Sequence, residues 1–380
     1  MFVAEGNDRA YVGKDKEQIL IDHINKFGIE GEYRSYEKIT SGHINRTYKV
    51  YFFRDGELKD YILQGVNTYV FKDPEKVMDN IISVTEYIRT KIKSTGISAK
   101  RYVLHYQMTA DGKYYYYDEK GGFWRCSRFI DDSQTFLTAS PFVMEESGKE
   151  FGEFQKYLSD YPVKDLFIAI PHFHNTILRF DTFRKSVEAD VCGRAKGVKN
   201  EIEDYLALEN RATETYRAQR AGILPLRVTH NDTKCSNVLF DRKTQEHLSV
   251  IDLDTVMPGL VAFDFGDAIR AGANSAAEDE KDLSLVSLDL TKYEAFTRGF
   301  LSVDKDALTQ AEIDSLAGGA IAMTLECGVR FLTDYLDGDK YFSTDYPEHN
   351  LVRARCQLAL AKDMLTHYDE MRDIVLKYAR

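Results

Sequence analysis

Cysteine, basic charge and long apolar runs are all scarce in this sequence. Only 5 of its 380 residues are cysteines, an odd number that includes no Cys-x-x-Cys pair. This usage is typical of reduced thiols, so we expect a cytosolic, cytoplasmic protein. Acidic residues outnumber basic residues by 61 to 50, which gives a net charge of -11. Because no patch concentrates Lys and Arg, we expect no nucleic-acid partner and no anionic-membrane surface.

Charged and polar residues interrupt the apolar residues along the whole chain. Residues 1–9 contain charged side chains and lack the apolar core of a signal peptide. The longest apolar stretch near the C-terminal end covers residues 317–325, whereas a membrane-spanning helix needs about 20 apolar residues. We therefore expect no membrane segment, and nothing in the sequence implies a protein partner. The length allows two domains, or one unit with two lobes, around a sizeable core.

The first 130 residues combine helical and strand-like patterns. Apolar side chains at helical spacing predict a helix over residues 15–27, and Asp73-Pro74 begins a second helix that runs to about residue 93. Alternating apolar and polar side chains predict antiparallel strands. These strands are expected at residues 33–39, 46–54, 60–67, 99–108 and 122–130. Asp55-Gly56 is a typical hairpin turn, and the tyrosine run at 114–117 fits alternating strand faces.

Beyond residue 145 the pattern is almost wholly helical, apart from two short strands near residues 238 and 250. The sequence therefore predicts an α+β fold with two lobes. Residues 1–130 are expected to form a small lobe, an antiparallel sheet with one main helix. Residues 131–380 are expected to form a large, mostly helical lobe, with a hinge at residues 131–134.

Polar residues at fixed spacing supply the groups that metal-assisted phosphoryl transfer requires. Asn237 follows Asp232 by five residues, and Asp252 follows it by twenty, at the end of an apolar strand. Phosphoryl transfer depends on a carboxylate that accepts the acceptor's proton and on oxygen ligands that hold Mg²⁺ against the phosphates of ATP. We expect Asp232 to be the catalytic residue and Asn237 and Asp252 to bind Mg²⁺. Asp254 is a further candidate as a second-metal or bridging ligand.

This order of residues resembles the kinase-like fold shared by protein kinases, aminoglycoside phosphotransferases and choline kinases. Asp252-Leu253-Asp254 replaces the Asp-Phe-Gly of protein kinases, which points to the small-molecule branch. Asp264-Phe265-Gly266 spells that motif literally, but it lies 32 residues after Asp232, too far for a loop and one hairpin. We expect a turn into a helix there, with Asp264 and Asp267 capping backbone donors and bracing the catalytic loop.

In this fold the first hairpin covers the phosphates of ATP, and small residues at its tip let backbone N–H groups approach them. A plain surface turn explains residues 41–45 about equally well. The third strand departs from the usual pattern, because Gln64 occupies the position of the phosphate-binding lysine. The end of the last strand is expected to lie against adenine. The candidate nucleotide-binding residues are Ser41, Gly42, His43, Asn45, Gln64, Phe129 and Ile130.

Several segments look like the N-acetylhexosamine 1-kinases, which are anomeric sugar kinases of the same superfamily. These segments are residues 41–45, 63–67, 170–175, 230–234, 251–259 and 330–336. The relatives also carry Gln beside the missing lysine, although Gly65 stands where a basic residue is expected. The resemblance implies ATP- and Mg²⁺-dependent phosphorylation of the C1 hydroxyl of N-acetylglucosamine or N-acetylgalactosamine. It also implies that Arg330 and Tyr341 contact the sugar, with Asp232 beside the anomeric hydroxyl.

Structural roles compete with these sugar contacts. Arg330 could form an ion pair on its own helix, because Glu326 and Asp334 both lie four residues away. Tyr341 could anchor the turn that follows Asp337-Gly338-Asp339. For Arg330 the motif match favours binding, whereas for Tyr341 the two roles are nearly balanced.

Three histidines are candidates for a metal-binding or catalytic role. His172 and His174 form half of a zinc motif, but no further Cys or His lies near them in the sequence. We favour a loop that packs on the catalytic lobe. His230 is expected to be structural and to pack beneath the catalytic loop.

Two other functions fit parts of the sequence. The same chemistry could act on an amino alcohol or an aminoglycoside, whose positive charge would suit the acidic run at 278–282. A solvated loop is the simpler interpretation of that run. Gln64 would also suit a nucleotide-binding pseudokinase, but Asp232, Asn237 and Asp252 are all retained, and a binding module does not need them.

Overall fold

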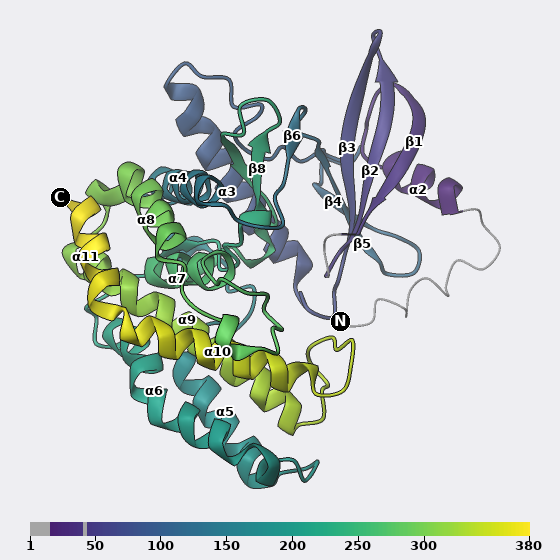
Figure 1. Ribbon diagram of the computed structural model, residues 1–380. Coiled ribbons are helices and arrows are strands. Elements are labelled where there is room, and N and C mark those ends of the chain that lie inside the picture. Colours follow the sequence, from purple (N-terminus) through teal and green to yellow (C-terminus); the bar gives the residue numbers. More distant parts are fainter. Residues whose placement is uncertain (1–15, 41–43) are drawn as a thin grey trace. The chain divides into compact units, whose positions relative to one another are not determined.

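The computed structural model describes residues 16–40 and 44–380. The chain divides into two compact units, Met1–Ser133 and Gln134–Arg380, and the short strand β6 (Ser133–Gln134) contains the boundary (Figure 1). A sheet with helices forms the first unit, and helices dominate the second. The predicted α+β class, with an antiparallel sheet followed by a helical region, is confirmed.

The first unit is built on a five-stranded antiparallel sheet in the order β1-β2-β3-β5-β4. Its strands are β1 (Glu32–Ile39), β2 (Arg46–Arg54), β3 (Glu57–Val66), β4 (Tyr115–Tyr117) and β5 (Phe123–Arg128). Asp55 and Gly56 join β2 to β3 with positive φ angles of 55° and 85°. That conformation matches the twist of the flanking strands, so the predicted hairpin turn is confirmed.

Two helices accompany this sheet, α2 (Lys16–Ile24) and α3 (Pro74–Ser94). α2 covers one face, where its apolar side chains meet every second residue of the central strands. The core formed there consists of Leu20, Ile24, Phe27, Val50, Phe52, Tyr61, Leu63, Trp124 and Cys126. Asp73 is the N-cap of α3 with Pro74 at the first helical position, although no side-chain hydrogen bond caps this helix.

The strand predicted over residues 99–108 is wrong. Only Tyr106 forms an isolated bridge there, opposite Ser127 of β5. The tyrosine run supplies the edge strand β4 instead, and β4 already pairs with residues 123–125 of β5. Few backbone groups on this edge of β5 remain free for residues 99–108. These residues form two backbone hydrogen bonds with β5, from the Gln107 N–H to the Cys126 carbonyl and from the Arg128 N–H to the His105 carbonyl.

Eight α-helices described in the second unit surround two short strand pairs. The helices are α4 (Pro141–Tyr157), α5 (Thr176–Ala189), α6 (Lys199–Arg220), α7 (Val261–Gly272), α8 (Leu290–Asp304), α9 (Gln310–Leu336), α10 (His349–Thr366) and α11 (Tyr368–Ala379). The antiparallel pairs are β7 (Arg227–Thr229) with β10 (Met257–Gly259), and β8 (Val238–Asp241) with β9 (His247–Val250).

Helix α9 forms the centre of the second unit. It packs against α5, α6, α7, α10 and α11 (Figure 1). Among the described residues it is the one helix long and apolar enough to cross a membrane, with a mean hydropathy of 1.2 over its most apolar window. Yet 78% of that window is buried inside the protein, as expected for a core helix.

Helices α7 and α9 cross at two glycines. A Cβ atom on Gly319 would lie 2.0 Å from the Ala262 carbonyl oxygen, and one on Gly266 would lie 2.4 Å from the Gly319 carbonyl oxygen. Both contacts are with backbone atoms, which cannot rotate away. Only a residue without a side chain allows the helices to approach this closely, and α7 carries Asp264 and Asp267, which are expected to brace the loop with Asp232.

Gly319→Ala is therefore expected to destabilise the protein by about 1–3 kcal/mol or more through overpacking. The neighbouring Gly318→Ala is the matched control, because its Cβ would meet Thr215 Oγ1 at an ordinary 3.7 Å. The control should be neutral or gain up to about 1 kcal/mol from helix propensity. Urea unfolding of both variants measures the difference, and equal stability would contradict the close crossing.

Candidate functional site

Two loops of the second unit lie side by side and carry the predicted catalytic residues. The first loop follows β7 and ends in a single 3₁₀ turn, Cys235–Asn237, and the second follows β9 and contains the turn Leu253–Thr255. The Ile251 backbone N–H donates to the Asn237 carbonyl at 2.9 Å. Because β8 and β9 form the hairpin between the loops, this backbone pairing fixes one loop against the other.

His230 is buried at the base of the first loop, between the rings of Phe151 and Phe154. Its Nδ1 accepts a hydrogen bond from the Asp232 backbone N–H at 3.3 Å, and its Nε2 lies 2.8 Å from the Ile251 carbonyl. These partners assign the proton to Nε2, which donates to the carbonyl. Both ring nitrogens are therefore used in joining the loops, and the predicted structural role of His230 is confirmed.

Two carboxylates of α7 hold the backbone of the same loop. Asp264 accepts hydrogen bonds from the backbone N–H groups of His230 at 2.8 Å and Asn231 at 2.7 Å, and Asp267 accepts one from Thr233 at 3.1 Å. Burial raises the pKa of Asp264, whereas the backbone donors favour its ionised form. The literal Asp-Phe-Gly sequence thus lies within α7 and not in a turn before it, whereas the predicted bracing of the loop by Asp264 and Asp267 is confirmed.

Asp232 is partly exposed and shares one of its oxygens with two neighbours. Asn237 Nδ2 donates to Asp232 Oδ2 at 3.0 Å and to its backbone carbonyl at 2.8 Å, while Lys234 Nζ lies 3.0 Å from the same Oδ2. Burial lowers the pKa of Lys234, but the charges of nearby Asp232, Asp252 and Asp267 more than offset this and raise it. Within the described residues Oδ1 of Asp232 accepts no hydrogen bond, so it is available to a ligand.

Asp252 has left-handed backbone angles, φ 62° and ψ 53°, at the start of the second loop. Such angles are uncommon for a residue with a side chain and recur at functional sites. Asp252 is exposed to solvent, but the protein groups packed around its carboxyl and the negative charges of Asp254 and Asp232 raise its pKa to about 6. Asp254 itself is almost fully buried.

This donor set suits a hard divalent cation. Mg²⁺ prefers carboxylate and amide oxygens, and the mutual repulsion of Asp232, Asp252 and Asp254 is what a cation would relieve. Asn237 uses its Nδ2 on Asp232, which leaves Oδ1 as its ligand atom. The residues present therefore fit the predicted Mg²⁺ site.

A partly buried histidine and a fully buried glutamate connect α9 to the loop that carries Asp232. His174 Nδ1 lies 3.0 Å from Glu326 Oε1, and its Nε2 lies 3.4 Å from the Asn231 carbonyl. The interpretation of residues 170–175 as a loop that packs on this unit is confirmed for His174, whose two ring nitrogens both have partners. Sequence reasoning missed this link, because Glu326 was considered only as a partner for Arg330.

Arg330 lies among aromatic rings one turn further along α9. Its guanidinium carbon is 6.0 Å from the Phe173 ring centroid, 5.7 Å from that of Tyr341 and 5.4 Å from that of Phe342. The alternative of an ion pair on the same helix is wrong: Glu326 pairs with His174, and no carboxylate of the described residues lies within ion-pair distance of Arg330. The guanidinium is half-buried and keeps its donors for a ligand.

Asp334 shapes the loop that brings Tyr341 beside Arg330. Its carboxylate accepts hydrogen bonds from the backbone N–H groups of Lys340, Tyr341 and Phe342 at 2.9, 2.7 and 2.9 Å. The turn is thus held by Asp334, whereas the Tyr341 side chain is 48% exposed. The structure brings Tyr341 and Arg330 together, and Phe173 and His174 join them to the loop that carries Asp232.

The second guanidinium in this neighbourhood was not predicted. Arg179 Nη2 donates to the Phe173 carbonyl at 2.7 Å, while its buried Nε has no hydrogen-bond partner in the part of the chain that the structure describes. Burial, followed by the positive charge of Arg330, lowers the pKa of Arg179. Sequence offered no signal for this residue, because Arg179 and Arg330 are brought together only by the packing of α5 against α9.

In the first unit Gln64 forms a polar ladder across three strands. Gln64 Nε2 donates to Thr47 Oγ1 at 3.2 Å, and Arg125 Nε donates to Gln64 Oε1 at 3.0 Å. Arg125 is only 2% exposed. A cation therefore accompanies the glutamine from the neighbouring strand, which the sequence analysis did not foresee.

The other nucleotide candidates of the first unit are only partly described. Ser41, Gly42 and His43 lie outside the described residues. Asn45 Oδ1 accepts the backbone N–H of Asn67 at 3.0 Å, which holds the end of the hairpin loop.

The last candidates lie just beyond β5. The Phe129 ring faces Lys49 Nζ at 3.7 Å, and Ile130 is buried with its carbonyl bonded to the Ser133 hydroxyl. Their backbone is therefore well fixed.

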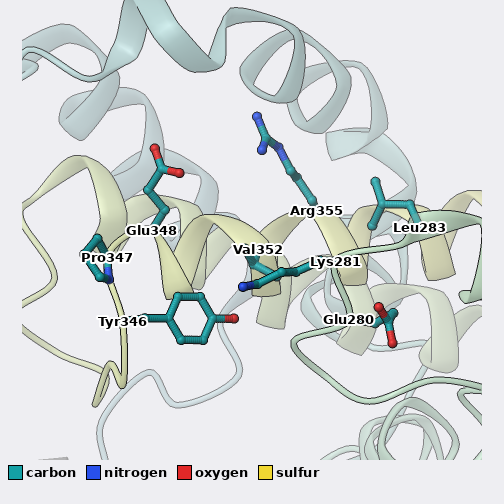
Figure 2. Close-up of a pocket in the computed structure, with 8 residues that line it drawn as sticks. All are labelled: Glu280, Lys281, Leu283, Tyr346, Pro347, Glu348, Val352 and Arg355. Carbon is teal, nitrogen blue, oxygen red and sulfur yellow. The ribbon is translucent and has the colours of Figure 1, made fainter.

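One hollow of about 310 Å³ lies elsewhere in the second unit, and Figure 2 shows side chains around it from residues 280–283, from residues 346–348 just before α10, and from α10 itself. Its two basic side chains already have partners: Lys281 Nζ lies over the Tyr346 ring at 4.5 Å, and Arg355 pairs with Glu201 at 2.6 Å. It contains none of the predicted site residues, and we assign it no role.

Residues 35–296 match the model of the phosphotransferase enzyme family (APH). Among solved structures, an aminoglycoside phosphotransferase from Alicyclobacillus acidocaldarius is similar with a TM-score of 0.58 and 11% identity over 94% of this chain and 96% of that one. A microcompartment-associated aminopropanol kinase has a TM-score of 0.59 and 15% identity over 92% and 98%. A choline kinase from Cryptosporidium parvum has a TM-score of 0.53 and 15% identity over 95% and 96%. At these identities the structural likeness shows the fold alone.

Asp264→Asn tests whether one carboxylate positions the catalytic loop. The amide has a single acceptor oxygen, so one of the two loop N–H groups would face an NH₂ group and lose its partner. We expect a loss of about 1–3 kcal/mol in the free energy of unfolding and faster amide exchange at residues 230 and 231. Asp289→Asn is the matched control, because Asp289 caps α8 and Asn is an equally good N-cap. Unchanged exchange in Asp264→Asn would contradict the bracing role.

Proposed function

This chain belongs to the phosphotransferase enzyme family, and we propose that it transfers the γ-phosphoryl group of ATP to the C1 hydroxyl of an N-acetylhexosamine. N-acetylglucosamine and N-acetylgalactosamine are the proposed acceptors, and the product is the hexosamine 1-phosphate. Kinases with this fold include enzymes named for small hydroxyl compounds. The acceptor proposed for this chain rests on its own residues.

Asp232 is the proposed catalytic residue. Its Oδ2 is fixed by Asn237 and Lys234, which leaves Oδ1 for the acceptor's hydroxyl group. There the carboxylate would orient the C1 hydroxyl and accept its proton as the oxygen attacks phosphorus. Lys234 supports this role because its ammonium group holds Oδ2 at 3.0 Å and so limits rotation of the carboxylate.

Asn237, Asp252 and Asp254 are the proposed Mg²⁺ ligands. When bound, Mg²⁺ neutralises charge on the phosphates of ATP. The chain's own contribution is to hold these oxygens in two loops that share backbone hydrogen bonds, so that little rearrangement is needed on binding.

In the first unit, the proposed nucleotide-binding residues are Ser41, Gly42, His43, Asn45, Gln64, Phe129 and Ile130. The buried Arg125 supplies positive charge beside Gln64, where the family's lysine would otherwise stand.

The choice of a sugar acceptor rests on one observation: the half-buried Arg330 forms no ion pair with any carboxylate of the described residues. The rings of Phe173, Tyr341 and Phe342 could form the kind of aromatic cage that binds quaternary ammonium groups, but the Arg330 guanidinium already faces all three. A second guanidinium, that of Arg179, adds positive charge. Choline, ethanolamine and aminoglycosides are cations and would be repelled there. A neutral sugar offers hydroxyl and acetamido oxygens that a guanidinium can bind, and rings that its apolar face can contact.

The acidic run at 278–282 does not supply an alternative cationic pocket. Glu278 pairs with Arg270 at 2.9 Å, and Asp279 lies 3.3 Å from His349 Nε2. These carboxylates are therefore occupied within their own unit. The retained set of Asp232, Asn237 and Asp252 likewise favours a working enzyme over a pseudokinase.

Asp232→Ala is expected to lower kcat by about a thousandfold or more, because both the base and the fixed acceptor position are lost. ATP affinity should change little, since Asp232 is assigned to the acceptor. Phosphorus NMR of the sugar product and calorimetry with ATP measure the two effects. Turnover that survives in the variant would refute the assignment of the base.

Arg330→Ala is expected to lower kcat/KM for N-acetylglucosamine or N-acetylgalactosamine by roughly 100-fold, while the KM for ATP stays unchanged. Arg372→Ala is the matched control, because it also removes a guanidinium beside an aromatic ring, Tyr368, at 5.9 Å, but on the exposed surface of α11. The same assay with choline and kanamycin tests the acceptor class. If only these cations yielded a phosphorylated product, the fold would stand and the proposed acceptor would be wrong.

A further inference from the structure

One histidine outside the candidate site lies against a row of carboxylates on a neighbouring helix. His247 is the first residue of β9, and α4 packs against that strand. Glu146, Glu150 and Glu153 lie on α4 at spacings of four and three residues, which places them on one face of the helix. Both elements belong to the second unit.

Glu146 fixes the orientation of the imidazole. Its Oε2 accepts a hydrogen bond from His247 Nδ1 at 2.6 Å and another from the His247 backbone N–H at 3.1 Å. Lys149 Nζ holds the other oxygen at 2.6 Å. Histidines that bind metal commonly donate one ring N–H to a carboxylate, which leaves the second nitrogen for the ion. Here that second nitrogen is Nε2.

The atoms that surround this nitrogen have the spacing of a metal site. One ligand atom each from His247, Glu150 and Glu153 lie within 4.8 Å of one another, the one such group of three found in the described part of the chain. His247 Nε2 and Glu153 Oε1 are 3.5 Å apart. Ligands of a tetrahedral ion with bonds of about 2.1 Å lie about 3.4 Å apart, so this pair needs almost no movement.

Glu150 points into the same group, and no side chain of residues 16–40 or 44–380 forms a hydrogen bond or an ion pair with it. It is only 5% exposed, and the backbone N–H of Val250 is the one donor that stabilises its carboxylate. Burial raises the pKa of Glu150 to about 8. Burial lowers the pKa of His247, but its hydrogen bonds to Glu146 and Glu153 outweigh this and raise it to about 10.

We propose that Glu150, Glu153 and His247 bind one divalent transition-metal ion of the Zn²⁺ class, with water completing its coordination. One imidazole nitrogen with two carboxylate oxygens suits Zn²⁺ better than Mg²⁺, which prefers oxygen ligands alone. The ion is structural. It joins α4 to β9, the strand that leads directly to Asp252. This site is independent of the proposed sugar kinase activity, because its ligands lie outside the groups assigned to that reaction.

The test is equilibrium dialysis of the metal-stripped, full-length protein against Zn²⁺ in millimolar Mg²⁺, which fills the proposed catalytic site. Wild-type protein should bind one Zn²⁺ per chain. Glu153→Gln should weaken binding by about tenfold or more, because a neutral amide replaces a carboxylate ligand at a half-exposed position. His247→Gln should weaken it at least as much. Zn²⁺ should also raise the melting temperature of the wild type and not that of Glu153→Gln.

Two controls distinguish this site from others. Glu145→Gln removes a carboxylate from the same helix, but Glu145 pairs with Arg298 at 2.5 Å and is not in the group around His247, so Zn²⁺ affinity should be unchanged. Asp252→Asn disrupts the proposed Mg²⁺ site and should also leave Zn²⁺ affinity unchanged. The proposal is overturned if the wild type binds no Zn²⁺ in Mg²⁺, if Glu153→Gln and His247→Gln bind it as tightly as the wild type, or if only Asp252→Asn loses it.

Discussion

The second unit depends on one buried carboxylate, that of Asp264. Burying a charge is costly unless several donors replace the lost water. Asp264 receives two backbone N–H groups of the catalytic loop and the amide of Gln155 at 3.1 Å. Because both backbone donors belong to adjacent residues, the carboxylate dictates the path of the loop at that point, including the left-handed Asn231 with φ 63°. The position of Asp232 follows from this path. The close crossing of α7 and α9 in turn fixes the helix that carries Asp264.

Helix α9 links the proposed acceptor site to the same loop. Glu326 and Arg330 are one turn apart and would ordinarily pair with each other. Glu326 instead pairs with His174, whose other nitrogen meets the Asn231 carbonyl. This choice of partner has two consequences. The Oε1 atom of the buried glutamate is bonded to His174, and Arg330 forms no ion pair with a carboxylate of the described residues. The contact between Glu326 and His174 therefore supports the loop that carries Asp232, and it also leaves the Arg330 guanidinium for the proposed acceptor.

The sequence predicted most of the fold because its signals were local. The turn at Asp55-Gly56 and the helix that begins at Pro74 needed only neighbouring residues. The strand expected over 99–108 failed because its existence depends on which segment pairs with the outer side of β5, and the tyrosines of β4 take that place. Segments that are distant in the sequence compete to pair with the same sheet edge. The alternation of apolar and polar residues within one segment therefore does not predict which segment pairs there.

Within the candidate site, the residues tied to a short motif were predictable and those tied to packing were not. Asp232, Asn237 and Asp252 follow one another at spacings that a loop and a hairpin impose. The bracing role of Asp264 and Asp267 could also be inferred, because carboxylates at the start of a helix seek backbone donors. Arg179 and His174 come from segments more than fifty residues away from the loop, and only the packing of α5 and α9 brings them near it.

Cross-strand contacts in the first unit explain why glutamine, and not the usual lysine, occupies position 64. Thr47, Gln64 and Arg125 are direct cross-strand partners, and the side-chain hydrogen bonds follow that register across β2, β3 and β5. A lysine at position 64 would place an ammonium directly opposite a buried guanidinium, and like charges in that arrangement destabilise a sheet. Glutamine can accept from the arginine and donate to the threonine at the same time. Gln64 and Arg125 therefore act together. Arg125 carries the positive charge on the neighbouring strand, and the Gln64 amide connects it to Thr47 of β2.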